Sequence, residues 1–259
     1  MRLIFLLETG ARPGAFNMRL DALLAESFES LAFPPESVAL RLYQWSPPAI
    51  SIGYHQRESD FDMAKLRADG IELCRRPTGG RAVFHIDDLT YAVATLATKS
   101  TAEHYAEINR AFKLALERLG IETDYQKRQP DFRARYQKPE SVSCFATSAR
   151  YELEVRGKKI IGSAQRRFGN ALLQHGSLAL SPKHKALPRY LALDEAARTL
   201  AQRELDEKTT SLAEVLGFAP TYDELKRAIV SGFEQVFNAT TTRLELSSLP
   251  FHDALAAHS

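Results

Sequence analysis

The sequence contains little cysteine and no long apolar run. Only two cysteines, Cys74 and Cys144, occur among 259 residues, too few for the disulfide framework of a secreted domain. No stretch approaches the roughly 18 to 20 apolar residues of a membrane helix. The apolar start of the chain ends at Glu8, too early for a signal peptide. We therefore expect free thiols in a reducing compartment, and a soluble, cytoplasmic protein that does not enter the membrane.

Phosphate-binding fingerprints are also missing. The chain has neither Gly-x-Gly-x-x-Gly nor Gly-Lys-Ser/Thr, which argues against a dinucleotide-binding or P-loop domain. The formal net charge is only +2, so the total charge predicts no nucleic-acid partner. Hydrophobic residues make up 44% of the chain and charged residues 25%, the balance of an ordinary globular protein that buries its own core.

The segments that are present mix strands and helices without a regular alternation. Capping-box sequences begin two of the helices, at Ser100 and at Thr221. The irregular order favours an α+β fold with a mixed, largely antiparallel sheet flanked by helices. We place a main domain at 1–205 and a small, mainly helical C-terminal extension packed on it at 206–259. Strands are predicted at 1–8, 37–45, 49–53, 71–74 and 89–96, and in a meander at 151–155, 158–165 and 171–180.

Cys144 is the first candidate for chemistry. It lies among small and hydroxylated residues, Ser141, Ser143 and Thr147, which leave room for a bulky acyl group beside the thiol. A nucleophilic cysteine requires a nearby cation or base that favours the thiolate. Free cysteines are commonly buried small hydrophobic residues instead, so the local sequence leaves both roles open.

A lysine close to a glycine is the second candidate. Lys159 follows the Arg156–Gly157 turn at the start of a predicted strand, and Gly162 lets a substrate approach the backbone. A lysine there could favour a thiolate and transfer a proton, or it could be a solvated residue at a strand end. Strand alternation places Lys158 on the opposite face, so only one of the two lysines points inward.

Two adjacent glycines form a candidate binding loop. They allow a ligand to approach backbone N–H groups closely, and three arginines flank them. Such a loop could hold the phosphate of a pantetheine arm or a thioester carbonyl, although a β-bulge with charged edges would have the same sequence. A lone histidine nearby is more often structural. The residues of this segment that we expect at the ligand are Arg75, Arg76, Thr78, Gly79, Gly80, Arg81 and His85.

A polar break in an apolar strand is the fourth candidate. The segment from Gln174 to Ser177 interrupts the last strand of the predicted meander, and its inward-facing side chains should line a cavity. A pair of Cys144 with His175 would suit a thioesterase or a cysteine hydrolase, although no sequence feature requires that pairing.

Basic residues also gather between the helix that begins at Ser100 and the predicted meander. They could steer an acidic carrier protein onto the surface, or they could form a solvated loop. The cluster consists of Lys127, Arg128, Arg133, Arg135 and Lys138, and Arg166 and Arg167 join it if they lie nearby.

These segments together resemble the lipoate–protein ligase and octanoyltransferase superfamily, which shares its catalytic fold with biotin protein ligases. Arg75–His85 resembles the family's Arg-Arg-x-Ser/Thr-Gly-Gly motif, Lys159–Ala164 its lysine motif, and Gln174–Ser177 its third block. Phe16–Asp21 and Trp45–Gly53 also fit. The resemblance implies a biotin/lipoate protein ligase-like catalytic domain at 1–205. It adds to the substrate-binding residues of the Gly-Gly loop a second set, Gly162, Ser163, Ala164, His175 and Gly176.

Cys144 separates the subgroups of this superfamily. ATP-using ligases carry Gly-Arg-Asn-Asp ahead of the lysine motif. This chain carries the Cys144–Glu152 stretch at that place, which is similar to octanoyltransferases of the Gram-positive type. The resemblance implies that Cys144 is the nucleophile and Lys159 its partner, without a cofactor or metal. It implies octanoyl-acyl carrier protein as the donor, and a lysine of the glycine cleavage H protein or a dehydrogenase E2 lipoyl domain as the acceptor.

Other activities remain compatible with the same motifs. An ATP-dependent lipoate ligase would use Lys159 to bind the carboxylate and the adenylate, with ATP and magnesium. An amidotransferase would move octanoyl between two lipoyl domains. An inactive carrier-binding protein would form a complex without transfer, and a thioesterase would release octanoate. The sequence departs from the family pattern at Asp88 and Ala92, where glutamate and serine are expected.

Overall fold

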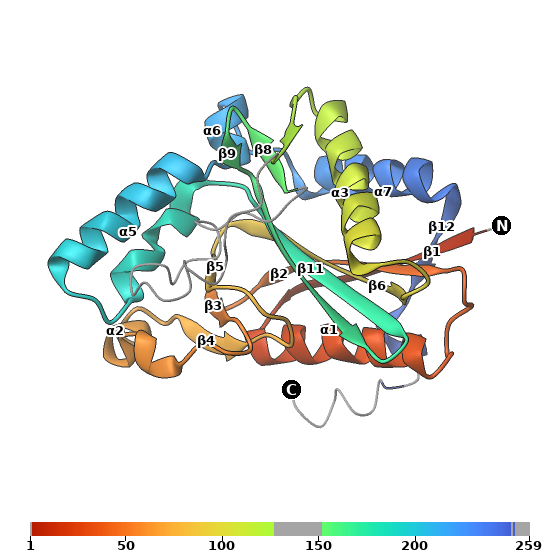
Figure 1. Ribbon diagram of the computed structural model, residues 1–259, viewed down its shortest axis with the longest axis horizontal. Helices are drawn as coiled ribbons and strands as arrows, with labels where there is room; N and C mark the ends of the chain where they lie inside the picture. Colours follow the sequence, from red (N-terminus) through yellow and green to blue (C-terminus); the bar gives the residue numbers. More distant parts are fainter. Residues whose placement is uncertain (1, 127–151, 250, 252–259) are drawn as a thin grey trace.

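A six-stranded mixed sheet forms the centre of the computed structural model, which describes residues 2–126, 152–249 and 251 (Figure 1). Its strand order is β10-β11-β6-β2-β1-β12. The first strand pairs in parallel with β2 and β12, whereas β2–β6, β6–β11 and β10–β11 are antiparallel. The strands are β1 (Arg2–Arg12), β2 (Val38–Trp45), β6 (Asp88–Leu96), β10 (Ile161–Phe168), β11 (Ala171–Ala179) and β12 (Ala239–Leu244).

Helices cover both faces of this sheet (Figure 1). On one face, α1 (Gly14–Glu29) packs Leu20, Leu24 and Phe28 against the sheet. On the other face, α3 (Thr101–Arg118) and α7 (Tyr222–Phe237) pack on each other and on the sheet. Because side chains alternate along a strand, the strands contribute side chains to the hydrophobic cores on both faces of the sheet. The expected α+β fold with a mixed, largely antiparallel sheet flanked by helices is therefore confirmed.

Capping residues explain where the helices of the second face begin. The Ser100 hydroxyl accepts from the Glu103 backbone N–H, and the Glu103 carboxylate accepts from the Ser100 backbone N–H. Thr221 and Glu224 form the same reciprocal pair at α7. Each pair satisfies backbone N–H groups that the first helical turn leaves without partners. Both predicted capping boxes are confirmed.

Two small sheets lie beside the main one. The first has the order β4-β3-β5, and the second has the order β7-β8-β9. None of the helices within the described ranges is long and apolar enough to cross a membrane. The remaining elements are β3 (Ala49–Ile52), β4 (Glu72–Arg75), β5 (Val83–His85), β7 (Asp124–Tyr125), β8 (Leu153–Val155), β9 (Lys158–Lys159), η1 (Glu58–Asp60), α2 (Met63–Ala68), η2 (Pro182–Tyr190), α5 (Glu195–Lys208), α6 (Leu212–Leu216) and η3 (Leu246–Ser248).

The predicted meander is wrong at its second strand. The segment 158–165 does not form one strand, because β9 ends at Lys159 in a small sheet and β10 begins at Ile161 in the main sheet. Where the chain passes from β9 to β10, Ile160 and Ile161 are both buried. Consecutive residues of a regular strand point to opposite faces, so a change of sheet at this point lets both isoleucines enter the hydrophobic core.

The region beyond residue 206 is expected from the sequence to be mainly helical, but it also contains a strand. β12 runs parallel to β1 at the edge of the main sheet, with Leu3 opposite Thr240. Within the same region, α7 packs its buried Phe233 against Phe112 of α3. The division into 1–205 and 206–259 stays a prediction.

Candidate functional site

A pocket lies between α1, the end of β2, β3, β5 and the β10–β11 pair. Its empty volume is about 320 Å³, which includes space open to solvent. Its wall combines apolar side chains with glycine backbone and a few polar groups. The lining residues are Met18, Tyr43, Trp45, Ser51, Arg76, Val83, His85, Thr90, Gly162, Ser163, Ala164, His175, Gly176 and Ser177.

Many residues that the sequence predicts at a ligand line this pocket. These are Arg76, His85, Gly162, Ser163, Ala164, His175 and Gly176. Thr78 lies just behind the wall, where its hydroxyl contacts His175. The structure therefore brings the segment of Arg76 and Thr78 together with β10 and β11, although 97 residues separate Thr78 from His175 along the chain. Their roles in binding a substrate stay predictions.

Arg75 does not line the pocket. One guanidinium nitrogen of Arg75 donates to the backbone carbonyls of Gly53, Tyr54 and Gln56, at 2.7 to 3.1 Å. A second nitrogen lies 3.7 Å from Glu58, in an exposed ion pair. The side chain therefore organises the turn after β3.

The two glycines of the predicted loop, Gly79 and Gly80, and Arg81 also lie outside the pocket lining. Gly80 instead packs against the chain after β3, where a Cβ built on Gly53 would lie 2.0 Å from the Gly80 carbonyl oxygen. Only a glycine at position 53 allows this approach. The backbone contact holds the loop against β3.

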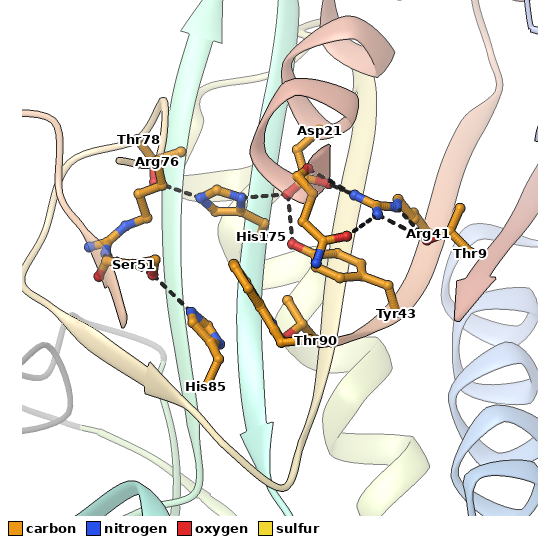
Figure 2. A network of polar contacts seen from close by, with 12 residues as sticks. Thr9, Asp21, Arg41, Tyr43, Ser51, Arg76, Thr78, His85, Thr90 and His175 are labelled. Carbon is orange, nitrogen blue, oxygen red and sulfur yellow. Dashed lines mark hydrogen bonds and ion pairs between the residues drawn. The ribbon is translucent and has the colours of Figure 1, made fainter. Parts of the chain in front are cut away.

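His175 is held between a carboxylate and a hydroxyl (Figure 2). Its Nδ1 lies 2.8 Å from Asp21 Oδ2, and its Nε2 lies 2.7 Å from Thr78 Oγ1. A carboxylate oxygen only accepts, so Nδ1 carries the proton, and in the neutral ring the Thr78 hydroxyl donates to Nε2. All three side chains are buried. The arrangement fixes the orientation of the imidazole at the pocket wall.

Asp21 connects this histidine to the core of the protein. It forms a 2.6 Å ion pair with Arg41, and both side chains are fully buried. It also accepts a 2.8 Å hydrogen bond from Tyr43. The other guanidinium nitrogens of Arg41 donate to Thr9 (Figure 2) and to Asn17. Burial, and next the Asp21 charge, raise the pKa of Tyr43 well above its usual value, so Tyr43 stays a neutral donor.

A second series of hydrogen bonds, again in the order carboxylate, imidazole and hydroxyl, lies on the β5 side of the pocket. His85 Nδ1 is 2.8 Å from Asp88 Oδ2, and His85 Nε2 is 2.8 Å from Ser51 Oγ. Burial lowers the pKa of His85, although Asp88 opposes this shift, so the ring is neutral and Ser51 donates to Nε2. The His85 ring stacks on Trp45 with a centroid distance of 3.9 Å. This pair presents a flat, uncharged wall to the pocket.

Asp88 fixes this wall by accepting three hydrogen bonds on one oxygen. His85, Thr90 and Ser177 donate to its Oδ2 at 2.8, 2.9 and 2.6 Å. Thr90 in turn accepts a 2.7 Å hydrogen bond from Trp45 Nε1. The aspartate that departs from the family pattern therefore holds both the histidine and the tryptophan in place.

Arg76 reaches the pocket from the loop after β4. Its guanidinium donates to the backbone carbonyls of Ser51, Gly79 and Arg81, at 2.7 to 3.1 Å. The side chain is only 4% exposed. It therefore closes the loop on itself and places one positive charge beside the apolar wall.

Lys159 is fully buried, as strand alternation predicts for one of the two adjacent lysines. Its Nζ lies 2.8 Å from Glu152 Oε1, and the two side chains are 0% and 2% exposed. Lys158 points outward and donates to the backbone carbonyl of Asp206. Lys159 is outside the pocket lining, three residues before Gly162, which belongs to it.

Cys144 and the basic cluster at 127–138 lie outside the described residues. Cys74 is the free cysteine within them. Burial, with a contribution from the Glu72 charge, raises the pKa of the Cys74 thiol to about 12, so this thiol is a poor source of thiolate. Within the described ranges, no three His, Cys, Asp or Glu side chains are grouped to hold a metal ion.

Sequence reasoning missed half of the pocket wall. Trp45 and Ser51 belong to a segment that resembles the family pattern, but neither was expected at the ligand. The sequence could have indicated a role for Asp21, since an aspartate on the apolar face of a predicted helix needs a buried partner. Arg41 could have been noticed in the same way, because it is a charged residue within an otherwise apolar strand. The other residues that were missed are Met18, Tyr43, Val83, Thr90 and Ser177.

Comparison with protein families and curated proteins gives a consistent result. The model of the lipoyl protein ligase A/B catalytic domain matches residues 13–234. Octanoyltransferase LipM of Symbiobacterium thermophilum is 37% identical over 249 residues, which cover 93% of this chain and 89% of that protein. The protein of the same name from Kyrpidia tusciae is 34% identical over 250 residues, covering 94% of this chain and 90% of its own.

Solved structures share the fold. A bi-partite lipoate protein ligase studied with its E2 lipoyl domain from Thermoplasma acidophilum superimposes with a TM-score of 0.75 at 23% identity, over 99% of this chain and 90% of that one. Lipoate-protein ligase A bound with ATP gives a TM-score of 0.69 at 20% identity, over 98% and 92% of the two chains. At these identities, the likeness concerns the fold alone.

Proposed function

The chain belongs to the lipoyl protein ligase A/B catalytic domain family, and from that premise we propose that it is an octanoyltransferase of lipoate biosynthesis. The observation that carries this function is the similarity to octanoyltransferases at 37% and 34% identity over nearly the whole of both chains. The enzyme is an acyltransferase. The likeness to ATP-binding ligases is confined to the fold, so ligation is the less supported alternative.

The pocket wall offers apolar surface of the kind that an acyl chain would contact. Met18, Trp45 and Val83 supply apolar surface, and each buried methylene stabilises binding by about 0.8 kcal/mol. The polar side chains of the wall already hydrogen-bond to one another, as with His85 and Ser51. An acyl chain can therefore enter without leaving these groups unpaired, which is the main penalty for burying polar surface.

Cys144 is the nucleophile in this proposal, and the positive charge of Lys159 favours loss of the thiol proton, so that Cys144 reacts as a thiolate. The thiolate attacks the thioester carbon of an octanoyl carrier, and backbone N–H groups stabilise the oxyanion. The bond to the pantetheine sulfur breaks, which leaves octanoyl-Cys144. The amine of an acceptor lysine then attacks this thioester, and Cys144 departs. A thioester is already activated for acyl transfer, so the reaction needs no ATP, metal or cofactor.

The partners follow from this reaction. The donor is octanoyl-acyl carrier protein, and the acceptor is a lipoyl domain, either the glycine cleavage H protein or a dehydrogenase E2 domain. The name of one structural neighbour pairs a lipoate protein ligase with its E2 lipoyl domain, which supports this class of acceptor. The side chains of Arg166 and Arg167 are exposed near the end of β10 and could steer an acidic carrier toward the pocket.

The acceptor reaction tests the function. The enzyme is mixed with octanoyl-acyl carrier protein and a lipoyl domain without ATP, and the lipoyl domain is weighed by mass spectrometry. We expect one added octanoyl group. Modification that requires ATP and free octanoate would identify a ligase, and modification only from octanoylated H protein would identify an amidotransferase. Release of free octanoate would indicate a thioesterase. Formation of a complex with the lipoyl domain without acyl transfer would indicate a carrier-binding protein.

A further inference from the structure

Glu152 is a buried carboxylate that the proposed reaction does not yet use. Its Oε1 lies 2.8 Å from Lys159 Nζ, and the two side chains are 2% and 0% exposed. Lysine and glutamate are rarely buried so completely unless they are paired. Taking both charges out of water is costly, and a buried pair often contributes little net stability. The pair therefore calls for an explanation other than stability of the fold.

Both partners are held in place by their backbones. The Lys159 carbonyl accepts from the Thr210 N–H at 3.0 Å, and Lys159 forms a β-bridge with Thr209. The Glu152 carbonyl accepts from the Gln126 N–H at 3.0 Å. These bonds place the two side chains opposite each other before any substrate binds.

The carboxylate of Glu152 also has a second donor. The Tyr105 hydroxyl of α3 lies 3.4 Å from Oε1, the oxygen that faces the ammonium. Elements from three parts of the chain thus meet at this one carboxylate: α3, the start of β8, and β9. A lysine and a carboxylate at 2.8 Å form a charge-assisted contact that fixes the direction of both side chains.

We propose that Glu152 is a positioning residue for octanoyl transfer, which holds Lys159 as an ammonium that can give and recover one proton in each cycle. This inference rests on the proposed function. When Cys144 attacks, the C–S bond to pantetheine breaks, and the Lys159 ammonium protonates the departing thiolate. Neutral Lys159 then takes the proton that the acceptor amine loses as its C–N bond forms. Cys144 leaves as a thiolate, and Glu152 stays a carboxylate throughout.

Glu154 provides a matched control. It lies directly opposite Lys159 in the β8–β9 register and is half-buried. Burial raises the pKa of Glu154, and the Lys159 charge opposes that shift. Glu154 therefore senses the same lysine, but it is Glu152 that forms the 2.8 Å ion pair. A general effect of nearby negative charge would make the two glutamates equivalent.

The test compares Glu152→Gln, Glu152→Asp and Glu154→Gln in the full-length enzyme, with thermal unfolding to confirm that each variant folds. Formation of octanoyl-Cys144 from octanoyl-acyl carrier protein is followed in single-turnover reactions. We expect Glu152→Gln to slow acylation by about 100-fold or more, as for loss of general acid–base catalysis, with KM changed by less than about threefold. We expect Glu152→Asp to regain part of the rate, and Glu154→Gln to stay within about threefold of wild type.

A folded Glu152→Gln enzyme that acylates at the wild-type rate would overturn the inference. If this variant does not fold, nitrogen NMR of the wild-type lysine Nζ groups replaces it, with Lys159 assigned from the signal lost in Lys159→Met. An ammonium signal at neutral pH is the expected result, and a neutral amine would contradict it. If the wild-type enzyme itself forms no octanoyl-Cys144, the proposed function fails instead.

Discussion

The Nδ1 atom of His175 lies 2.8 Å from the Asp21 carboxylate, and this buried hydrogen bond joins the pocket wall to helix α1. Asp21 also neutralises Arg41, which is fully buried. A single carboxylate thus satisfies a cation in the core and orients an imidazole at the site. Stability and activity are therefore both expected to depend on Asp21.

Replacing Asp21 by Asn tests the stabilising part of this role. The change leaves the buried Arg41 guanidinium without a compensating charge, and we expect the free energy of unfolding to fall by about 3–5 kcal/mol. Urea denaturation measures this difference. Glu26→Gln on the same helix is the control, because the Arg19–Glu26 pair is exposed and its loss should cost about 0–1 kcal/mol. Equal effects of the two substitutions would contradict the assignment.

The Thr78 hydroxyl is expected to matter for activity through His175. In Thr78→Val the side chain keeps its shape, but Nε2 of His175 loses its 2.7 Å partner. A buried polar group without its partner costs about 1–3 kcal/mol of stability, and loss of the fixed orientation of the ring at the pocket wall should slow octanoyl transfer by roughly tenfold. Thr78→Ser retains the hydroxyl and should stay close to wild type. Wild-type transfer rates in Thr78→Val would show that the hydroxyl only fills space.

Gly176 is required by close packing between β10 and β6. A Cβ at this position would lie 2.5 Å from the Gly162 carbonyl oxygen and 2.7 Å from the Tyr91 ring. Gly176→Ala should therefore destabilise the protein by about 1–3 kcal/mol, as overpacking does. In Gly79→Ala the added methyl would have no neighbour within 4 Å, and the expected change is about 0.5 kcal/mol or less in magnitude. Thermal or urea unfolding of both variants decides between these outcomes.

Acid should destabilise the protein partly through His85. Burial lowers the pKa of His85 in the folded state, whereas the unfolded chain titrates near about 6.5. Below that pH the unfolded state binds more protons, so stability falls as pH decreases from about 6.5 toward the folded pKa. Burial lowers the pKa of His104 and His184 too. Urea unfolding at several pH values should show a weaker acid dependence in His85→Asn, and an unchanged dependence would exclude His85 as a contributor.

Much of the fold could be predicted because local signals agree with it. The alternation in β2 and β6 and the capping boxes of α3 and α7 each determine one element without reference to the rest of the chain. The strand β12 lacks such a signal, since its threonines and Arg243 are largely exposed at the sheet edge. The break at Ile160 was hidden because two adjacent isoleucines look like an uninterrupted strand.

The candidate site divides in the same way. Glycines and arginines around Gly79 predicted a binding loop; Arg76 and His85 of this segment line the pocket, whereas Gly79 and Gly80 do not. The contacts that complete the site join distant residues: 154 positions separate Asp21 from His175, and 34 separate Ser51 from His85. No local pattern encodes such pairs, so they became visible only when the sheet brought the strands together.

The mass of the enzyme after exposure to octanoyl-acyl carrier protein, without ATP or acceptor, tests the central claim most directly. One added octanoyl group is expected, absent in Cys144→Ala and retained in Cys74→Ser, because burial keeps the Cys74 thiol protonated with a pKa of about 12. An unmodified wild-type enzyme would contradict the thioester route. An adduct that persists in Cys144→Ala would show that another residue carries the acyl group.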